Sequence, residues 1–254
     1  MSKQLWKPGN MLYPLPAVLV TTRNQNGAED ICTVAWAGTV CTNPPMISIS
    51  LRKSRLTYEY LCETGFFGVN LTTEALAFAA DFCGVRSGRE IDKFRECGLH
   101  KFNAEFAACP LVSESPINIE CKVARTLDLG SHTMFIASVL AIHADEAYMD
   151  GSGRFDLALA KPIVYSHGMY AGLGKSIGTF GYSVRKKSEK CGHKVSEKTV
   201  PKPLKKLNHG FGRSITEKMA RNAVVTKEVA VNKKSAKKKQ ISYMENAGRK
   251  AQQK

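Results

Sequence analysis

The chain of 254 residues is 43% hydrophobic and can therefore bury a sizeable core without disulfide or metal staples. Its net charge of +15 is unevenly spread: residues 185–254 contain 21 Lys or Arg and 5 Glu, a net charge of +16, whereas residues 1–184 contain 16 basic and 17 acidic residues, a net charge of −1. The first 184 residues therefore lack the basic surplus that attracts a polyanion.

Most of the eight cysteines stand in apolar or alternating runs, and the N-terminus does not resemble a secretory signal. We interpret the cysteines as reduced, mostly buried thiols. The apolar stretches are far shorter than the roughly 20 residues that a membrane-spanning helix needs. We therefore expect a soluble, cytoplasmic protein.

The first half of the chain predicts strands joined by short turns. Residues 13–23 are rich in β-branched side chains and lead to Asn26-Gly27, a pair that favours a hairpin turn, and residues 31–40 supply the return strand. Residues 46–51 alternate apolar and polar side chains and predict a third strand, reached without a long crossover.

Two helices and four more strands follow. Ser54 is placed to N-cap a helix through residue 63, Gly65 is placed to end it, and residues 73–82 have apolar side chains at helical spacing. Alternating or apolar runs predict strands at 66–71, 117–123, 134–143 and 163–166.

These elements predict a mainly β fold with helical additions, in which roughly seven mostly antiparallel strands form a barrel. A doubly wound sheet is disfavoured because the first 50 residues lack alternating strands and helices. Residues 185–254 combine high charge with few apolar side chains, which predicts a largely disordered, basic tail. Within it, residues 214–225 have one apolar face and predict a marginal helix.

Several short motifs do not fit their usual patterns. Residues 172–176 resemble the end of a phosphate-binding loop, but the glycine that the pattern requires at position 169 is a methionine. The same glycines are not followed by the acidic residue that dinucleotide binding needs. Cys191-Gly192-His193 has no second ligand pair at metal spacing, so we predict no metal site.

Six segments, taken together, carry a specific resemblance. They are TVAWAGTVCTNPP at 33–45, LRKSRLTY at 51–58, SGREIDKF at 87–94, GSH at 130–132, YSHGMY at 165–170 and GTFGYSV at 178–184. In their order and spacing they resemble the flavin-reductase-like family of FMN-binding split barrels, and flavoredoxin-like members in particular. The resemblance covers about residues 1–184, which we expect to form one domain followed by the tail.

The resemblance implies a split β-barrel that forms a homodimer and binds FMN near the subunit interface. The residues that it implies for cofactor binding are Val34, Ala35, Trp36, Ala37, Arg52, Ser54, Thr57, Ser87, Gly88, Asp92, Lys93, Phe94, His167 and Tyr170. It implies that His132, the catalytic residue, lies near the flavin and the nicotinamide. Ser131 stands where the family has an acidic residue, a departure that bears on how His132 is oriented and how basic it is.

The residue chemistry fits these roles. Arg52, Ser54 and Thr57 offer cationic and hydroxyl donors to a phosphate at the start of a helix, where the helix dipole favours an anion. The small residues of 33–38 let a backbone approach a flat ring closely, and Lys93 or Ser87 could reach the phosphate or the ribityl chain. Simpler interpretations are a capped helix, a core strand and a solvated Asp92–Lys93 pair.

Three hypotheses about function follow. In the first, NAD(P)H reduces bound FMN, which then passes electrons to a protein, a free flavin or another acceptor. In the second, the protein is an electron carrier of the flavoredoxin kind, reduced by a partner protein without NAD(P)H activity. In the third, the tail docks on nucleic acid, an anionic membrane or an acidic redox partner, the alternative being a solvated appendage. The cysteines receive no catalytic role, although Cys41 lies close to the ring-facing strand.

Overall fold

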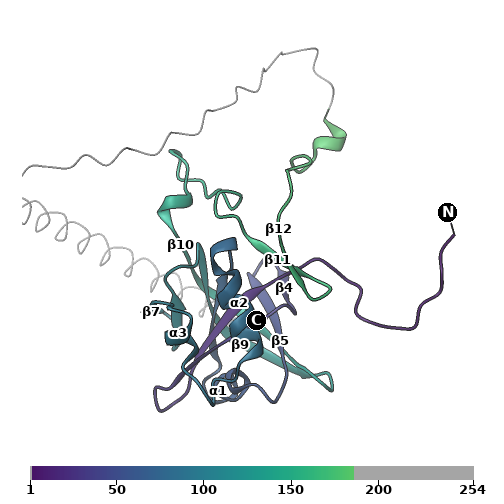
Figure 1. Cartoon of the computed structure of the whole chain (residues 1–254). Helices are drawn as coiled ribbons and strands as arrows, with labels where there is room; N and C mark the ends of the chain where they lie inside the picture. The colour runs from purple at the N-terminus through teal and green to yellow at the C-terminus, as the bar shows by residue number, and fades with distance from the viewer. Residues whose placement is uncertain (1, 186–254) are drawn as a thin grey trace, which may run out of the picture. The chain divides into compact units, whose positions relative to one another are not determined.

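The computed structural model describes residues 2–185 (Figure 1). The predicted tail disorder, the 214–225 helix and Cys191-Gly192-His193 lie outside the described residues. Within 2–185 no helix is both long enough and apolar enough to cross a membrane.

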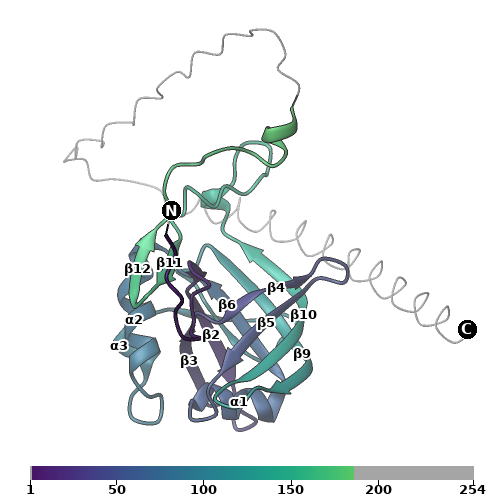
Figure 2. The same cartoon turned by 90° about the vertical axis from the view of Figure 1, so that its right-hand side faces the viewer.

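A seven-stranded antiparallel sheet forms the body of the described part. Its strands are β2 (Val18–Arg23), β3 (Glu29–Val34), β4 (Ala37–Cys41), β5 (Met46–Leu51), β6 (Phe66–Leu71), β9 (Ile117–Asp128) and β10 (Thr133–Ala144). They pair in the order β3-β2-β6-β9-β10-β5-β4. The edge strands β3 and β4 follow each other in the chain, and the sheet curls around a common interior (Figure 2). The predicted mainly β fold with helical additions is confirmed.

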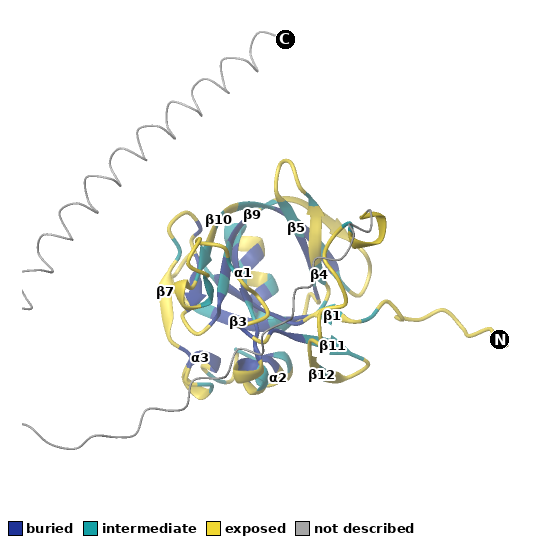
Figure 3. Ribbon diagram, turned by 90° about the horizontal axis from the view of Figure 1, so that it is seen from above, coloured by how far each residue is buried: buried dark blue, intermediate teal, exposed yellow. Residues whose placement is uncertain are grey.

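Strand β2 is buried on both faces because two cores meet across it. Val18 and Val20 pack inside the curled sheet with side chains such as Phe67 and Phe135. Leu19, which points to the opposite face, packs outside beneath the helices α2 (Ala77–Val85) and α3 (Lys93–Glu96). The buried strands at the centre and the exposed rim are visible in Figure 3.

Helix α1 (Leu56–Thr64) lies at one end of the sheet, with Leu61 in the inner core (Figures 1 and 2). Gly65 ends α1 in the left-handed region at φ 71°, as predicted. The prediction that Ser54 caps α1 is wrong. The chain first makes a turn in which the Arg55 N–H donates to the Arg52 carbonyl, 3.1 Å away, so that Arg55 is the N-cap residue and Ser54 stays exposed.

Smaller elements complete the described part. A three-stranded sheet joins β1 (Leu15–Pro16), β11 (Ile163–Ser166) and β12 (Met169–Gly172), and β7 (Lys101–Asn103) pairs with β8 (Pro110–Val112). The 3₁₀ turns are η1 (Glu74–Leu76), η2 (Glu146–Tyr148) and η3 (Tyr182–Val184). The predicted helix at 73–82 is instead η1 followed by α2, which continues to Val85.

The seven cysteines of the described part are free thiols, in agreement with the interpretation of reduced, mostly buried side chains. Those that are buried are Cys32, Cys83, Cys109 and Cys121, whereas Cys41 and Cys97 are partly exposed and Cys62 is exposed.

Candidate functional site

The chain bends between β3 and β4, and the bend creates one wall of the candidate site. The Trp36 carbonyl accepts a 2.8 Å hydrogen bond from the Ser50 N–H of β5, and the Ala37 N–H donates to the Ala35 carbonyl at 2.9 Å. The single strand predicted at 31–40 is therefore wrong, because this non-local bond divides it into two. The bend leaves Trp36 38% exposed.

A cleft of about 700 Å³ opens beside this bend, a volume within the range of small-molecule sites. Its walls come from β3 and the bend, the turn before α1, the helix α2, the loop before β10 and the β11–β12 hairpin. The lining residues are Asn10, Ala17, Cys32, Thr33, Val34, Ala35, Trp36, Ser50, Leu51, Arg52, Arg55, Asp81, Gly84, Val85, Ser131, His132, Tyr165, Gly168 and Tyr170.

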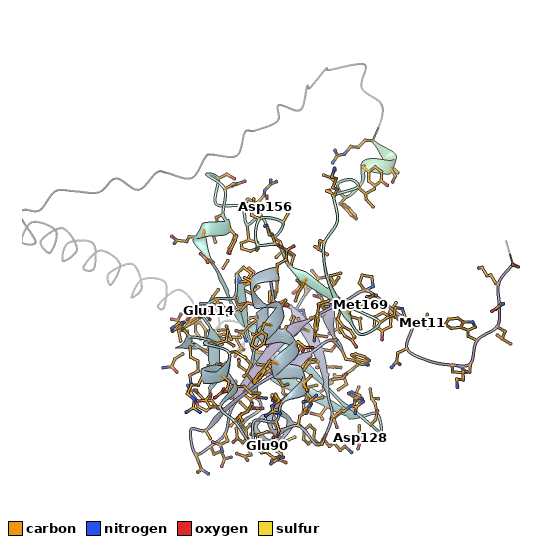
Figure 4. All side chains as sticks on the ribbon, viewed as in Figure 1. Met11, Glu90, Glu114, Asp128, Asp156 and Met169 are labelled. Carbon is orange, nitrogen blue, oxygen red and sulfur yellow. The ribbon has the colours of Figure 1, made fainter. Side chains whose placement is uncertain are left out.

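The N-terminal segment and the β11–β12 hairpin form the outer wall of the cleft. Strand β1 pairs with β11, and the Tyr13 ring lies 4.3 Å from that of His167 between centroids. Met11 and Met169, labelled in Figure 4, lie on the same side of the body. His167 therefore braces this wall through Tyr13 and does not line the cleft.

Trp36 and His132 face each other with nearly parallel rings, 6.1 Å apart between centroids and inclined by 4°. The Ser131 hydroxyl lies 2.9 Å from His132 Nδ1. Burial disfavours the imidazolium, and the nearby Arg52 guanidinium repels it, so the pKa of His132 is held below its usual value. The imidazole is therefore mainly neutral at pH 7.

A smaller cavity of about 280 Å³ adjoins the cleft, since Arg52, Arg55 and Val85 line both. We call it the anion pocket; its lining residues are Asp30, Arg52, Ser54, Arg55, Leu56, Val85, Arg86, Ser87, Gly88 and Lys93. Within residues 2–185 neither Arg52 nor Arg86 forms a salt bridge with a carboxylate. Arg55 donates to the Gly84 carbonyl at 2.6 Å. Four cations around one carboxylate favour an anion here.

The one carboxylate of the anion pocket, Asp30, is already satisfied. Its Oδ1 lies 2.9 Å from Lys93 Nζ, with both side chains 3% exposed, and its Oδ2 accepts a hydrogen bond from the Thr57 hydroxyl. A Cβ on Gly88 would lie 2.0 Å from Asp30 Oδ1, so only glycine fits beside this pair. Lys93 therefore forms the floor of the anion pocket, whereas Thr57 is fully buried and does not line it.

Three further predicted residues lie outside the cleft and the anion pocket. The Asp92 carboxylate caps α3 by accepting from the Arg95 N–H at 3.2 Å, and Phe94 is buried in the outer core. Both border a third cavity of about 500 Å³. Ala37 pairs with Ile49 within the sheet and lines none of the three cavities.

The comparisons with known proteins decide the family. Residues 11–174 match the family model of the flavin reductase like domain. The chain belongs to this family. The resemblance inferred from the sequence is therefore confirmed.

Two solved structures share the fold over most of the chain. Flavoredoxin of Desulfovibrio vulgaris (Miyazaki F) is 30% identical with a TM-score of 0.68, and the match covers 73% of this chain and 100% of that structure. Flavoredoxin of Methanosarcina acetivorans is 26% identical with a TM-score of 0.67 and the same coverage. This agreement supports the mainly β fold with helical additions that the sequence predicts.

A relative found by sequence is an uncharacterised protein of Aeropyrum pernix. It is 28% identical over 156 residues, which are 61% of this chain and 58% of that protein. The chain thus spans a little over half the length of this relative.

The structure brings most of the predicted residues of this family site together. Those that line the cleft or the anion pocket are Val34, Ala35, Trp36, Arg52, Ser54, Ser87, Gly88, Lys93, His132 and Tyr170. Sequence reasoning missed Arg55 and Arg86, although each is adjacent in sequence to a serine that was predicted. It also missed Asp81 and Val85, since the outward face of α2 carries no local sign of a cleft.

Proposed function

We propose that this chain binds FMN across the cleft and the anion pocket and works as a flavoprotein oxidoreductase. The observation that carries the proposal is the junction of the two cavities at Arg52 and Arg55. A cofactor with a flat ring at one end and a phosphate at the other needs a roomy cleft that leads into a cationic pocket.

The residues present fit both ends of FMN. The guanidinium groups of Arg52 and Arg86 and the hydroxyl groups of Ser54 and Ser87 would hold the phosphate, because such donors form strong, charge-assisted hydrogen bonds. The bend at Ala35 and Trp36 would hold the ring, since it brings backbone groups and an aromatic side chain to the wall of the cleft.

Bound FMN would supply the electron-transfer chemistry. The neutral His132, in contact with the Ser131 hydroxyl, is proposed as the catalytic residue that donates or accepts a hydrogen bond at the ring. Arg52, at the junction of the two cavities, favours negative charge in the cleft.

For the electron donor we propose NAD(P)H, with a flavin or a protein as acceptor. The alternative is a carrier reduced by a redox partner protein, which the likeness to two flavoredoxins supports. We also propose a cytoplasmic homodimer, on the resemblance to the family alone.

Cofactor binding is tested by titrating the purified protein with FMN and following flavin absorbance and fluorescence. Arg86→Gln is expected to weaken FMN binding about tenfold or more, because a hydrogen bond to a charged group contributes roughly 1.5–3 kcal/mol. Arg95→Gln, on the exposed side of α3, is the matched control and should bind as the parent protein does. A parent protein that takes up no FMN would refute the proposal.

The donor is tested by anaerobic mixing of the FMN-loaded protein with NADH or NADPH. Rapid bleaching of the flavin absorbance is expected of a reductase. If neither nucleotide bleaches the flavin but a reduced ferredoxin-like protein does, the carrier function is correct and the reductase function is wrong.

A further inference from the structure

Two cysteines, one in α2 and one just after α3, meet in the outer core. Cys83 lies in the last turn of α2 and is buried, whereas Cys97 directly follows α3 and is partly exposed. Their sulfur atoms are 3.9 Å apart. Five of the residues between them, 84–96, line the anion pocket: Val85, Arg86, Ser87, Gly88 and Lys93.

We propose that Cys83 and Cys97 form a reversible disulfide, called here the staple, that links the two ends of the segment 84–96 and restricts its motion. A disulfide bond is about 2 Å long, so the sulfur atoms must approach by roughly 2 Å, a distance that side-chain rotation and a small shift of α3 can provide. Helix α3 has only four residues, and Lys93 at its start is held by Asp30 of β3. The approach must therefore come from the other end of α3, where Cys97 follows Glu96, and from rotation of the two side chains.

The oxidant is a peroxide, and the reaction balances without a further reactant. The Cys97 thiolate attacks one peroxide oxygen, the O–O bond breaks, and a sulfenic acid forms at Cys97. The Cys83 sulfur then attacks the Cys97 sulfur and displaces the hydroxyl group as water. In total two thiols and one hydrogen peroxide give one disulfide and two waters, and a small thiol reductant reverses the bond.

Access to solvent decides which thiol reacts first. Cys97 reaches the surface and Cys83 does not. Burial is the largest influence on the Cys97 thiol and raises its pKa, and the negative charge of Glu96 raises it further. The contact with Cys83 and the positive charge of Lys93 lower this pKa in part. Because the thiolate is the nucleophile, oxidation should become faster as the pH rises toward this raised pKa.

The consequence for the cofactor rests on the proposed function. With its two ends linked, the segment 84–96 would hold Arg86 and Ser87 in place around a phosphate. We therefore expect FMN to dissociate several-fold more slowly from the oxidised protein than from the reduced protein.

The staple is tested on the full-length protein with hydrogen peroxide. After oxidation at pH 8 and blocking of the remaining thiols, mass spectrometry should find a peptide that links Cys83 to Cys97, and dithiothreitol should release it. Cys97→Ser should give no such peptide. Cys62→Ser, which removes an exposed thiol of α1, is the matched control and should give the same linked peptide as the parent protein.

Amide hydrogen exchange measures whether the disulfide restricts the motion of the segment 84–96. Oxidation should slow amide exchange within 85–96 in the parent protein and in Cys62→Ser, but not in Cys97→Ser. The proposal is overturned if both thiols stay open to alkylation after peroxide treatment, or if the bond forms and exchange does not change. Both measurements work without FMN, so a failure to bind FMN would refute the proposed function and leave the staple to be judged by itself.

Discussion

At the scale of single residues, the protonation of His132 distinguishes this chain from the pattern that its family resemblance implies. An acidic neighbour would stabilise the imidazolium and raise the pKa of the histidine. Ser131 supplies only a hydroxyl, while burial and Arg52 both disfavour the charged form. A neutral imidazole can accept or donate one hydrogen bond in the cleft without carrying a charge into it.

The first prediction is that Arg52→Gln raises the pKa of His132 toward its ordinary value. Burial still lowers this pKa in the variant, so the recovery should be partial. NMR titration of the imidazole measures it, with His132→Asn to assign the signal and Arg95→Gln as the control that removes a distant charge. An unchanged pKa in Arg52→Gln would contradict the assigned cause.

The lowered pKa of His132 also decides how the free energy of unfolding changes with pH. Because the pKa of His132 is lower in the folded chain, the unfolded chain binds its proton more readily. The contribution of this group to the free energy of unfolding is therefore complete above the unfolded pKa of about 6.5 and is lost as the pH falls below it.

At the scale of elements, one ion pair ties α3 to the sheet. Lys93 in the first turn of α3 reaches Asp30 in β3, and Thr57 of α1 donates to the same carboxylate. Three elements around the anion pocket therefore meet at one buried charge. The floor of this pocket depends on the pair staying intact.

The second prediction is that Lys93→Met lowers the free energy of unfolding by about 3–5 kcal/mol, because it leaves Asp30 buried without its counter-charge. Urea unfolding followed by circular dichroism measures the loss. The double variant Asp30→Asn with Lys93→Met should recover much of it, since no uncompensated charge then remains.

A matched control for this pair is the exposed salt bridge between Lys53 and Asp128. Lys53→Met should leave the unfolding midpoint unchanged, since exposed pairs contribute little. A comparable loss in Lys53→Met and Lys93→Met would mean that burial of the Lys93–Asp30 pair is not what makes it important.

Elements whose signal is local were predictable from the sequence. The alternation in 46–51 and the apolar run in 66–71 gave the bounds of β5 and β6, and Gly65 gave the end of α1. The division at Ala35 and Trp36 was not predictable, because it depends on a hydrogen bond from Ser50 in another strand. Short α3, whose cap and ion pair stabilise only four helical residues, lacks the periodicity that marks a helix.

At the scale of the whole molecule, the candidate site exists only because distant parts of the chain meet. Trp36, Asp81, His132 and Tyr170 come from four separate elements or loops and line one cleft. Periodicity and spacing cannot reveal such a meeting. The ordered motifs of the family did predict most of the residues that meet at the site. They could not predict lining residues that lie outside the motifs, such as Asp81 and Val85.

Charge separates the chain into two parts with different expected partners. Residues 1–184 have a net charge of −1 and residues 185–254 a net charge of +16, so the basic surplus that attracts a polyanion lies in the second part. We propose that this basic segment docks on nucleic acid. If it does, the logarithm of the binding constant should fall linearly with the logarithm of the salt concentration, as counterions are released from the phosphates.

The third prediction compares the full chain with a chain that ends at Arg185. The full chain should bind duplex DNA in a salt-dependent manner, and the shorter chain should not, because the basic surplus has been removed. FMN affinity should be the same in both, since the cleft and the anion pocket lie within residues 2–185. Fluorescence anisotropy with labelled DNA measures the first quantity and flavin fluorescence the second.

A variant of the full-length chain tests whether positive charge is what binds DNA. Residues 233–239 read KKSAKKK, and replacing their five lysines by glutamine should lower the steepness of the salt dependence by about 0.9 for each lysine that contacts a phosphate. If the chain without residues 186–254 binds DNA equally strongly, the DNA-binding site lies within the first 185 residues. The proposed role of the basic segment would then be wrong. Loss of FMN binding on truncation would instead show that the cofactor site needs residues beyond Arg185.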